Sequence, residues 1–237
     1  MESLHTTVNY YRSNQIFQDE IIIVWGTPAS PFVKKVLIAL TAHDLTYEIK
    51  PVLPSAFNQF LGKVDPTHFV NISPFGRIPV LEIGTLHIPE SAAILYYLDK
   101  AYTQKLYSSD PAEVAAIIAY ERFADYDLAN ITTRRLFYEN WAKPQAFQQA
   151  PNTRIVEKAL STDLPPLLEY LETELDNKTY MVANQVTAAD IAITVQLWAC
   201  SQANVPIDSA LYPQLDRYYK AMLQHPSIAL HLAKRGQ

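Results

Sequence analysis

The 237-residue chain is poor in the residues that mark several common kinds of site. Its one cysteine, Cys200, cannot form an internal disulfide, which is typical of a reducing compartment. None of its 5 glycines stands in a G-x-G or Walker pattern, so no nucleotide-phosphate loop is expected. The 6 histidines show no metal-ligand spacing with one another or with Cys200, and no metal is expected from the sequence.

Charge and apolar runs argue against two further classes of protein. The net charge is −5 and lysine and arginine form no stripe, so no nucleic-acid partner is expected. The longest apolar runs, at residues 21–25 and 92–98, are too short to span a bilayer. Residues 1–20 contain no apolar segment of the kind found in secretory signals. We therefore expect a cytoplasmic globular protein with no membrane partner.

The first half of the chain has the pattern of an α/β unit. The apolar, β-branched run at residues 21–25 is typical of a strand covered on both faces. A helix is expected after it, with Lys34 and Lys35 on the face opposite its apolar residues. A strand at residues 47–53 completes a β-α-β unit, whose connection should be parallel and right-handed.

Two further strands, at residues 79–83 and 86–88, and a helix from Ser91 follow in the sequence. The expected order is β-α-β, then a connector, then β-β-α, which gives a mixed sheet. The fold class is therefore α/β in the first half and all-α in the second. We divide the chain into an N-terminal extension (residues 1–20), an α/β domain (21–103), a linker (104–109) and an all-helical domain (110–237).

The helical half begins with clear start signals. Asp110 and Pro111 are suited to the N-cap and first position of a helix that continues to about residue 141. Thr187 and Asp190 form a capping box before an apolar helix at residues 187–203, which we expect to be buried. Further helices are expected at about 153–176, at 211–224 and after Pro226.

Residues 73–98 hold three features that favour one kind of ligand. Pro79 follows Ile78 at a strand start, where a cis bond would leave the Ile78 backbone free to pair with an extended peptide. Ser91 stands at a helix N-terminus, which favours a carboxylate. Glu90 beside it can meet an ammonium group. Each residue alone is more often structural, but their combination predicts a site for a small zwitterionic peptide.

Ser30 is the best candidate for chemistry. It lies between the first strand and the first helix, at the end of the sheet where ligands bind in open α/β folds. Its hydroxyl can donate a hydrogen bond to a thiolate, assisted by the helix dipole. Lowering a thiol pKa of ~8.5 by ~2 units needs ~3 kcal/mol, within reach of these two effects. An ordinary N-cap serine remains the alternative, and Thr27 is a weaker rival.

In their order, these segments resemble the cytosolic glutathione transferases. The shared pattern is a strand, Ser-Pro-Phe opening a helix, Ser-Pro-Phe-Gly-Arg-Ile-Pro-Val-Leu at residues 73–81, Glu-Ser opening another helix, and a Thr-Ala-Ala-Asp capping box. The resemblance covers residues 21 to about 235. It implies a thioredoxin-like domain that binds glutathione as co-substrate, a helical domain that helps bind a small electrophile, and a homodimer.

The resemblance also implies roles for individual residues. Ser30 would stabilise the glutathione thiolate, as in the serine-type classes. Ile78, before cis-Pro79, would pair with the cysteinyl backbone. Glu90 and Ser91 would hold the γ-glutamyl end of glutathione, with Arg77 near the site. Phe123 and Tyr126, together with Thr27, are assigned to the electrophile pocket.

Two positions depart from the pattern. Where several classes carry His-Lys for the glycine end of glutathione, this chain has Val64-Asp65, with Lys63 just before. The second-domain motif has Ala183-Asn184 where glycine is usual, and Asn184 can adopt the left-handed conformation. Cys200 is assigned to core packing.

Three functions stay open at this point. The first is conjugation of glutathione to apolar electrophiles in detoxification, and a peroxidase or isomerase using the same site is a variant of it. The second is a non-catalytic protein that binds glutathione or apolar ligands on this fold. The third is an interaction module built on the arm at residues 1–20.

Overall fold

The computed structural model describes residues 20–232, and the proposed extension at residues 1–20 lies almost wholly outside the described residues. The first half contains, in order, β1 (Ile22–Trp25), α1 (Pro31–Ala42), β2 (Glu48–Lys50), α2 (Ser55–Phe60), α3 (Thr67–Ile72), β3 (Val80–Ile83), β4 (Leu86–Pro89) and α4 (Ser91–Ala101). The expected β-α-β, connector, β-β-α order is confirmed, and the connector contains two short helices.

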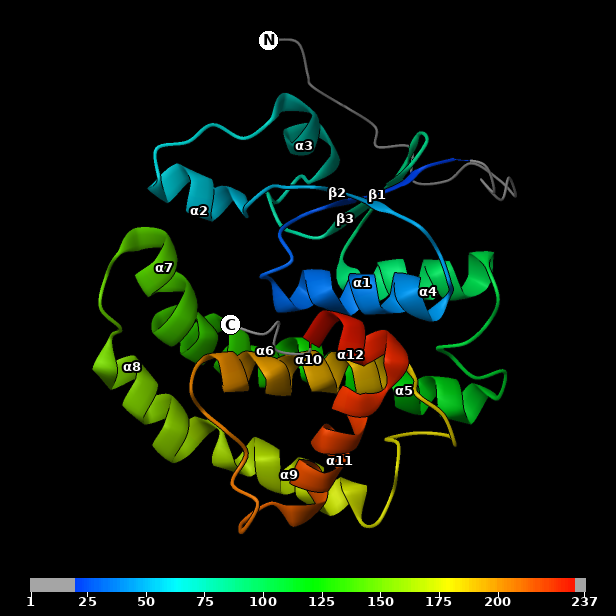
Figure 1. The fold of residues 1–237 in the computed structure, drawn as a ribbon, viewed down its shortest axis with the longest axis vertical. Helices are drawn as coiled ribbons and strands as arrows, with labels where there is room; N and C mark the ends of the chain where they lie inside the picture. Colours follow the sequence, from blue (N-terminus) through cyan, green and yellow to red (C-terminus); the bar gives the residue numbers. More distant parts are fainter. Residues whose placement is uncertain (1–19, 233–237) are drawn as a thin grey trace.

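The four strands form one mixed sheet in the order β2-β1-β3-β4. β1 pairs with β2 in parallel, whereas β3 runs antiparallel to both β1 and β4. Apolar side chains of α1 and α4 cover one face, and α2 and α3 lie on the other side of the sheet (Figure 1). This is a thioredoxin-like arrangement, as the resemblance implied.

The second half is helical. Its elements are α5 (Pro111–Phe123), π-helical η1 (Ala124–Leu128), α6 (Ala129–Ile131), π-helical η2 (Thr132–Ala142), α7 (Lys143–Phe147), α8 (Thr153–Lys158), π-helical η3 (Ala159–Asp163), α9 (Pro165–Leu175), α10 (Ala188–Gln202), α11 (Pro213–Gln224) and α12 (Pro226–Leu232). The expected helices are all present, although three stretches are wound as π-helix. None of the helices between residues 20 and 232 is both long and apolar enough to cross a membrane.

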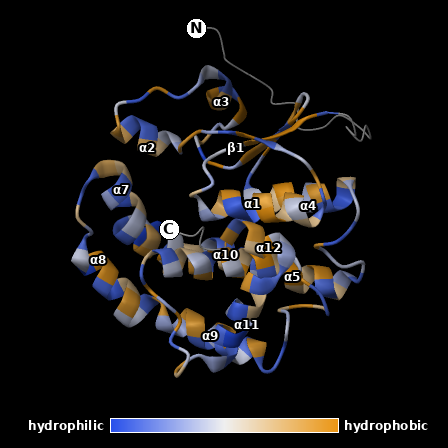
Figure 2. Ribbon diagram, in the orientation of Figure 1, coloured by the Kyte–Doolittle hydropathy of each residue, from blue (hydrophilic) through white to orange (hydrophobic). Residues whose placement is uncertain are grey.

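Helix α10 is the centre of the helical half. Every residue from 188 to 200 is buried, as the largely apolar sequence of this helix predicted. Figure 2 colours α10 and its neighbours by hydropathy. Asp190 fixes the start of this helix by accepting hydrogen bonds from the backbone N–H of Thr187 (2.9 Å) and of Met181 (2.8 Å) and from the hydroxyl of Tyr218 (2.9 Å). One carboxylate therefore ties α10 to α11 and to the loop before it. In that loop the left-handed residue is Ala183 (φ 60°), not Asn184 as expected.

The two halves meet across α1. The face of α1 that carries Lys34 and Lys35 does not face solvent but packs on the helical half. Lys35 is fully buried, and its Nζ lies 2.8 Å from Glu121 Oε1 and 2.6 Å from Asp125 Oδ2. Burial lowers the pKa of Lys35, but the attraction of both carboxylates outweighs burial and raises the pKa above its ordinary value of 10.5.

Replacing Asp190 by alanine should lower the free energy of unfolding by about 3–5 kcal/mol, because four buried donors, the Thr187 hydroxyl (2.8 Å) among them, lose their acceptor. Asp110 provides a matched control, since it caps α5 in the same way through the N–H groups of Ala112 and Glu113 but is exposed. Asp110→Ala should cost only about 1 kcal/mol. Urea unfolding followed by circular dichroism measures both, and equal costs would contradict the central role of Asp190.

Lys35→Met should also destabilise the protein by about 3–5 kcal/mol, because it leaves two buried carboxylates without their cation. Combining it with Glu121→Gln and Asp125→Asn should recover part of the loss. Since the folded pKa of Lys35 is raised, the wild-type advantage should be complete below pH 10.5 and shrink as the pH rises beyond it. Unfolding measured at pH 7 to 11.5 tests this, and an advantage that grows with pH would refute it.

Candidate functional site

The register of the sheet brings the predicted ligand-binding residues to one edge. Trp25, the last residue of β1, pairs with Val80, the first of β3, and Val80 pairs with Pro89, the last of β4. The segments just beyond these residues therefore emerge side by side. They are the β1–α1 turn with Ser30, the Ile78-Pro79 bond, and the Glu90-Ser91 start of α4.

At the β1–α1 turn, the hydroxyl of Ser30 is not used to cap α1. The backbone N–H of Ser30 donates to the carbonyl of Thr27 (2.9 Å) and its carbonyl accepts from Lys34 (2.9 Å), but its side chain makes no capping hydrogen bond. The hydroxyl oxygen of an ordinary N-cap serine would accept a hydrogen bond from a backbone N–H of the first helical turn. The side chain is partly exposed. The hydroxyl is thus available to a ligand at the positive end of the α1 dipole.

Ile78 lies directly against this turn. Its bond to Pro79 is cis, as predicted. A side chain at Gly26 would lie 3.5 Å from Ile78 Cβ and only 2.6 Å from Val33 Cγ2, so Gly26 permits the close approach of β1, α1 and Ile78. The segment that carries Ile78 is also fixed at its start, where the Ser73 hydroxyl donates to the carbonyl of Arg77 (2.8 Å).

The start of α4 carries a buried hydroxyl beside an exposed acid. Ser91 is 5% exposed, whereas Glu90 adopts a left-handed backbone (φ 69°) that turns the chain into the helix. Arg77 Nη1 lies 3.4 Å from Glu90 Oε1, and both side chains are exposed. Such a solvent-screened pair is weak, so it leaves Glu90 able to meet a ligand ammonium group.

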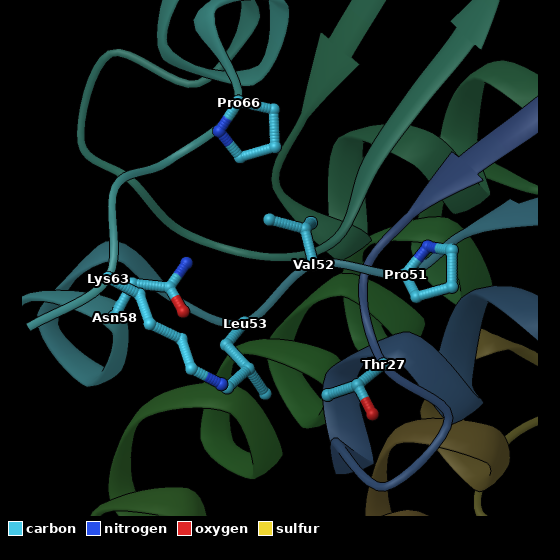
Figure 3. Close-up of a pocket in the computed structure, with 7 residues that line it drawn as sticks. All are labelled: Thr27, Pro51, Val52, Leu53, Asn58, Lys63 and Pro66. Atoms are coloured by element: carbon cyan, nitrogen blue, oxygen red, sulfur yellow. The ribbon is translucent and has the colours of Figure 1, made fainter. Parts of the chain in front are cut away.

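A cleft of about 280 Å³ opens beside this edge, next to the end of β2 (Figure 3). Its lining includes Thr27 from the β1–α1 turn and Lys63 from the loop after α2. That loop is held in place because the Asn58 side chain donates to Asp65 (2.6 Å) and the Lys63 N–H donates to the carbonyl of Asn58 (2.8 Å). The full lining is Thr27, Pro51, Val52, Leu53, Asn58, Lys63 and Pro66.

Phe123 and Tyr126 do not share the face that meets α1. That face is occupied by Asp125, which binds Lys35. Phe123 packs edge-on against Tyr170 of α9 (ring centroids 5.0 Å apart), and the exposed Tyr126 lies under the guanidinium of Arg122 (3.7 Å). Their assignment to an electrophile pocket stays a prediction without a contact that supports it.

Other aromatic side chains join the two halves of the chain near α1 and α2, and the sequence did not predict them. The rings of Phe57 in α2 and Tyr138 in η2 meet edge-on across the two halves of the chain (5.8 Å). Arg134 of η2 lies over Phe32 in the first turn of α1 (5.8 Å). The aromatic and basic composition of residues 132–142 is the sequence feature that could have indicated these contacts. The direction of these side chains was not readable, because a π-helix does not follow the 3.6-residue period.

Two family models match the chain. The N-terminal domain of glutathione S-transferase matches residues 25–106, and the C-terminal domain of glutathione S-transferase matches residues 137–235. The chain belongs to the glutathione S-transferase family. The resemblance read from the sequence is confirmed.

The individual relatives are distant. A glutathione S-transferase from Hyoscyamus muticus is 27% identical over 169 residues, which cover 70% of this chain and 76% of that protein. Elongation factor 1-gamma 2 from Oryza sativa subsp. japonica is 30% identical over 162 residues, covering 67% of this chain but only 37% of the factor. A solved glutathione S-transferase from Rhodospirillum rubrum F11 superposes with a TM-score of 0.78 at 23% identity, over 92% of this chain and 94% of that one.

The lone thiol of this family member lies far from solvent. Cys200 is buried in α10, and burial raises its pKa to about 12. It is therefore protonated at neutral pH and cannot serve as a nucleophile. This agrees with its assignment to core packing and leaves Ser30 as the candidate for sulfur chemistry.

Proposed function

We propose that the protein is a glutathione transferase that conjugates the glutathione thiolate to small, largely apolar electrophiles. The observation that carries the proposal is the convergence of Ser30, Ile78 and Ser91 at one sheet edge, with a Ser30 hydroxyl that does not cap its own helix. A peptide backbone, a carboxylate and a thiolate each have a complementary group there.

In this proposal the ligand is held along its length. The buried Ser91 hydroxyl and the N-terminus of α4 bind the γ-glutamyl carboxylate, and Glu90 binds the adjacent ammonium group. The Ile78 backbone pairs with the cysteinyl residue, as in β-strand addition. Lys63 meets the glycine carboxylate in the cleft, a contact that the sequence left in doubt.

The chemistry follows from that placement. The sulfur lies near Ser30, whose hydroxyl donates a hydrogen bond that favours the thiolate over the thiol. The α1 dipole adds to this effect. The thiolate then attacks an electrophilic carbon held between the first turn of α1 and η2, where Phe32, Phe57 and Tyr138 offer apolar surface. Proximity and thiolate stabilisation supply the rate enhancement.

A non-catalytic binding role is the second candidate, and the comparison with elongation factor 1-gamma favours it. That relative, which is named as an elongation factor and not as a transferase, shares 30% identity over two thirds of this chain. Retention on glutathione-agarose without conjugation of any electrophile in a panel would support this second role. A peroxidase or isomerase reaction at the same site would appear in the same panel when hydroperoxides are included. A homodimer and a cytoplasmic location belong to the proposal by family membership alone.

Ser30→Ala should lower kcat/KM for conjugation of a chloronitrobenzene at pH 6.5 by about 100-fold, because losing ~2 units of thiol pKa depression removes ~3 kcal/mol. The pH profile of kcat/KM should move toward ~8.5, the pKa of a free thiol, while glutathione still binds. Ser30→Thr should keep much of the activity. If Thr27→Ala shifts the pH profile of kcat/KM and Ser30→Ala does not, then Thr27 and not Ser30 stabilises the thiolate.

Lys63→Ala should raise the KM for glutathione about 5-fold and leave kcat unchanged, because an exposed ion pair is worth about 1 kcal/mol and acts equally in ground and transition states. Lys50→Ala removes an equal charge at the exposed end of β2, outside the cleft lining, and serves as the matched control. Equal effects of the two substitutions would show that only net charge matters.

A further inference from the structure

On the sheet face away from α1 and α4, three potential metal ligands meet. They are His68 of α3, Glu82 of β3 and His87 of β4, and one ligand atom from each lies within 4.8 Å of the other two. His68 Nε2 lies 2.8 Å from Glu82 Oε2, and His87 Nε2 lies 3.7 Å from the same oxygen. This group could not be predicted from the sequence, because spacing along the chain does not show which residues pair across a sheet.

The fold explains why these side chains meet. Glu82 and His87 are direct partners in the antiparallel β3–β4 ladder, so their side chains leave the same face close together. His68 approaches from α3, which lies over this face, and its ring packs on Trp25 (5.2 Å) and on His87 (5.6 Å). The arrangement is thus set by sheet register and by ring packing.

The donor set suits a borderline divalent ion. Zn²⁺ binds imidazole nitrogen and carboxylate oxygen at about 2.0–2.2 Å, so two atoms on one ion lie roughly 3–3.5 Å apart. The distances of 2.8 and 3.7 Å bracket that value. Two imidazoles and one carboxylate leave further coordination positions for water, as in open three-ligand sites.

An outer hydrogen bond and an access route complete the site. The indole N–H of Trp25 donates to Glu82 Oε2 (2.7 Å), which orients the carboxylate as outer partners do in metal sites. The His68 side chain is 50% exposed, whereas Glu82 and His87 are 16% and 23% exposed. An ion can therefore enter from solvent and finish in a partly enclosed position.

We propose that His68, Glu82 and His87 bind a divalent transition-metal ion of the Zn²⁺ type. The ion replaces the His68–Glu82 hydrogen bond and links α3 to the β3–β4 hairpin. Because α3 ends at Ile72, directly before the segment with Ser73, Ile78 and Pro79, the ion would also restrain the approach to the proposed glutathione site. The metal site itself does not depend on the transferase proposal.

Calorimetric titration of the untagged, EDTA-treated full chain with Zn²⁺ tests the proposal. We expect about one ion per chain and a melting temperature that rises with Zn²⁺ concentration. His68→Gln, Glu82→Gln and His87→Gln should each weaken binding at least 10-fold, and Trp25→Phe should weaken it about 10-fold through the lost orienting hydrogen bond. His225→Gln, which removes a partly buried imidazole of the helical half, should leave binding unchanged.

Co²⁺ gives a second, independent measurement. Its visible absorption should indicate nitrogen and oxygen ligation in the wild type and be lost in the His68→Gln/His87→Gln double variant, with circular dichroism confirming that this variant is folded. No binding by the wild type, or equal binding by the double variant, would overturn the proposal and leave a plain His–Glu hydrogen bond.

Discussion

The buried charge of Lys35 is the constraint on which the relation between the two halves depends. A buried ammonium is tolerated only beside compensating charge, and both of its partners come from the helical half. Glu121 is itself held by the hydroxyl of Tyr107 (2.7 Å). The rotation of α1 about its axis is therefore fixed from outside its own domain. Because Ser30 begins the same helix, the position of its backbone is set with it.

Sheet register positions the segments of the proposed ligand site, just as the Lys35 ion pairs position the two halves of the chain. The Trp25–Val80–Pro89 row brings three segments to one edge, although Trp25 and Pro89 are 64 residues apart in sequence. A one-residue shift in the β1–β3 pairing would turn Glu82 to the opposite face and move Ile78 away from the β1–α1 turn, and one in the β3–β4 pairing would turn His87 away from Glu82. The same register thus supports both the proposed peptide-binding edge and the cluster of His68, Glu82 and His87.

Local signals made much of this predictable. The place of Ser30 at the start of α1, the cis bond before Pro79 and the capping box of Asp190 each depend on residues close by in the chain, and the sequence predicted all three. The sequence places Lys35 on the face of α1 opposite its apolar residues. It does not show what covers that face, because the partner Asp125 comes 90 residues later. The left-handed position falls on Ala183 and not on Asn184, although asparagine adopts that conformation at lower cost. The contact between His68 and Glu82 was not predicted either, because the two residues are separated in the sequence and meet only in the fold.

The π-helical windings explain why side-chain directions in the helical half are hard to predict from the sequence. The winding changes at Ala124, so the direction of Tyr126 does not follow the period of the preceding helix. Asp125 takes the α1-facing position, and an aromatic contact between the two halves forms further along, where Tyr138 meets Phe57. The buried ion pairs therefore come from α5 and η1, and this aromatic contact comes from η2. On this reasoning, variation within residues 132–142 should alter which electrophiles fit more than variation at Phe123 or Tyr126.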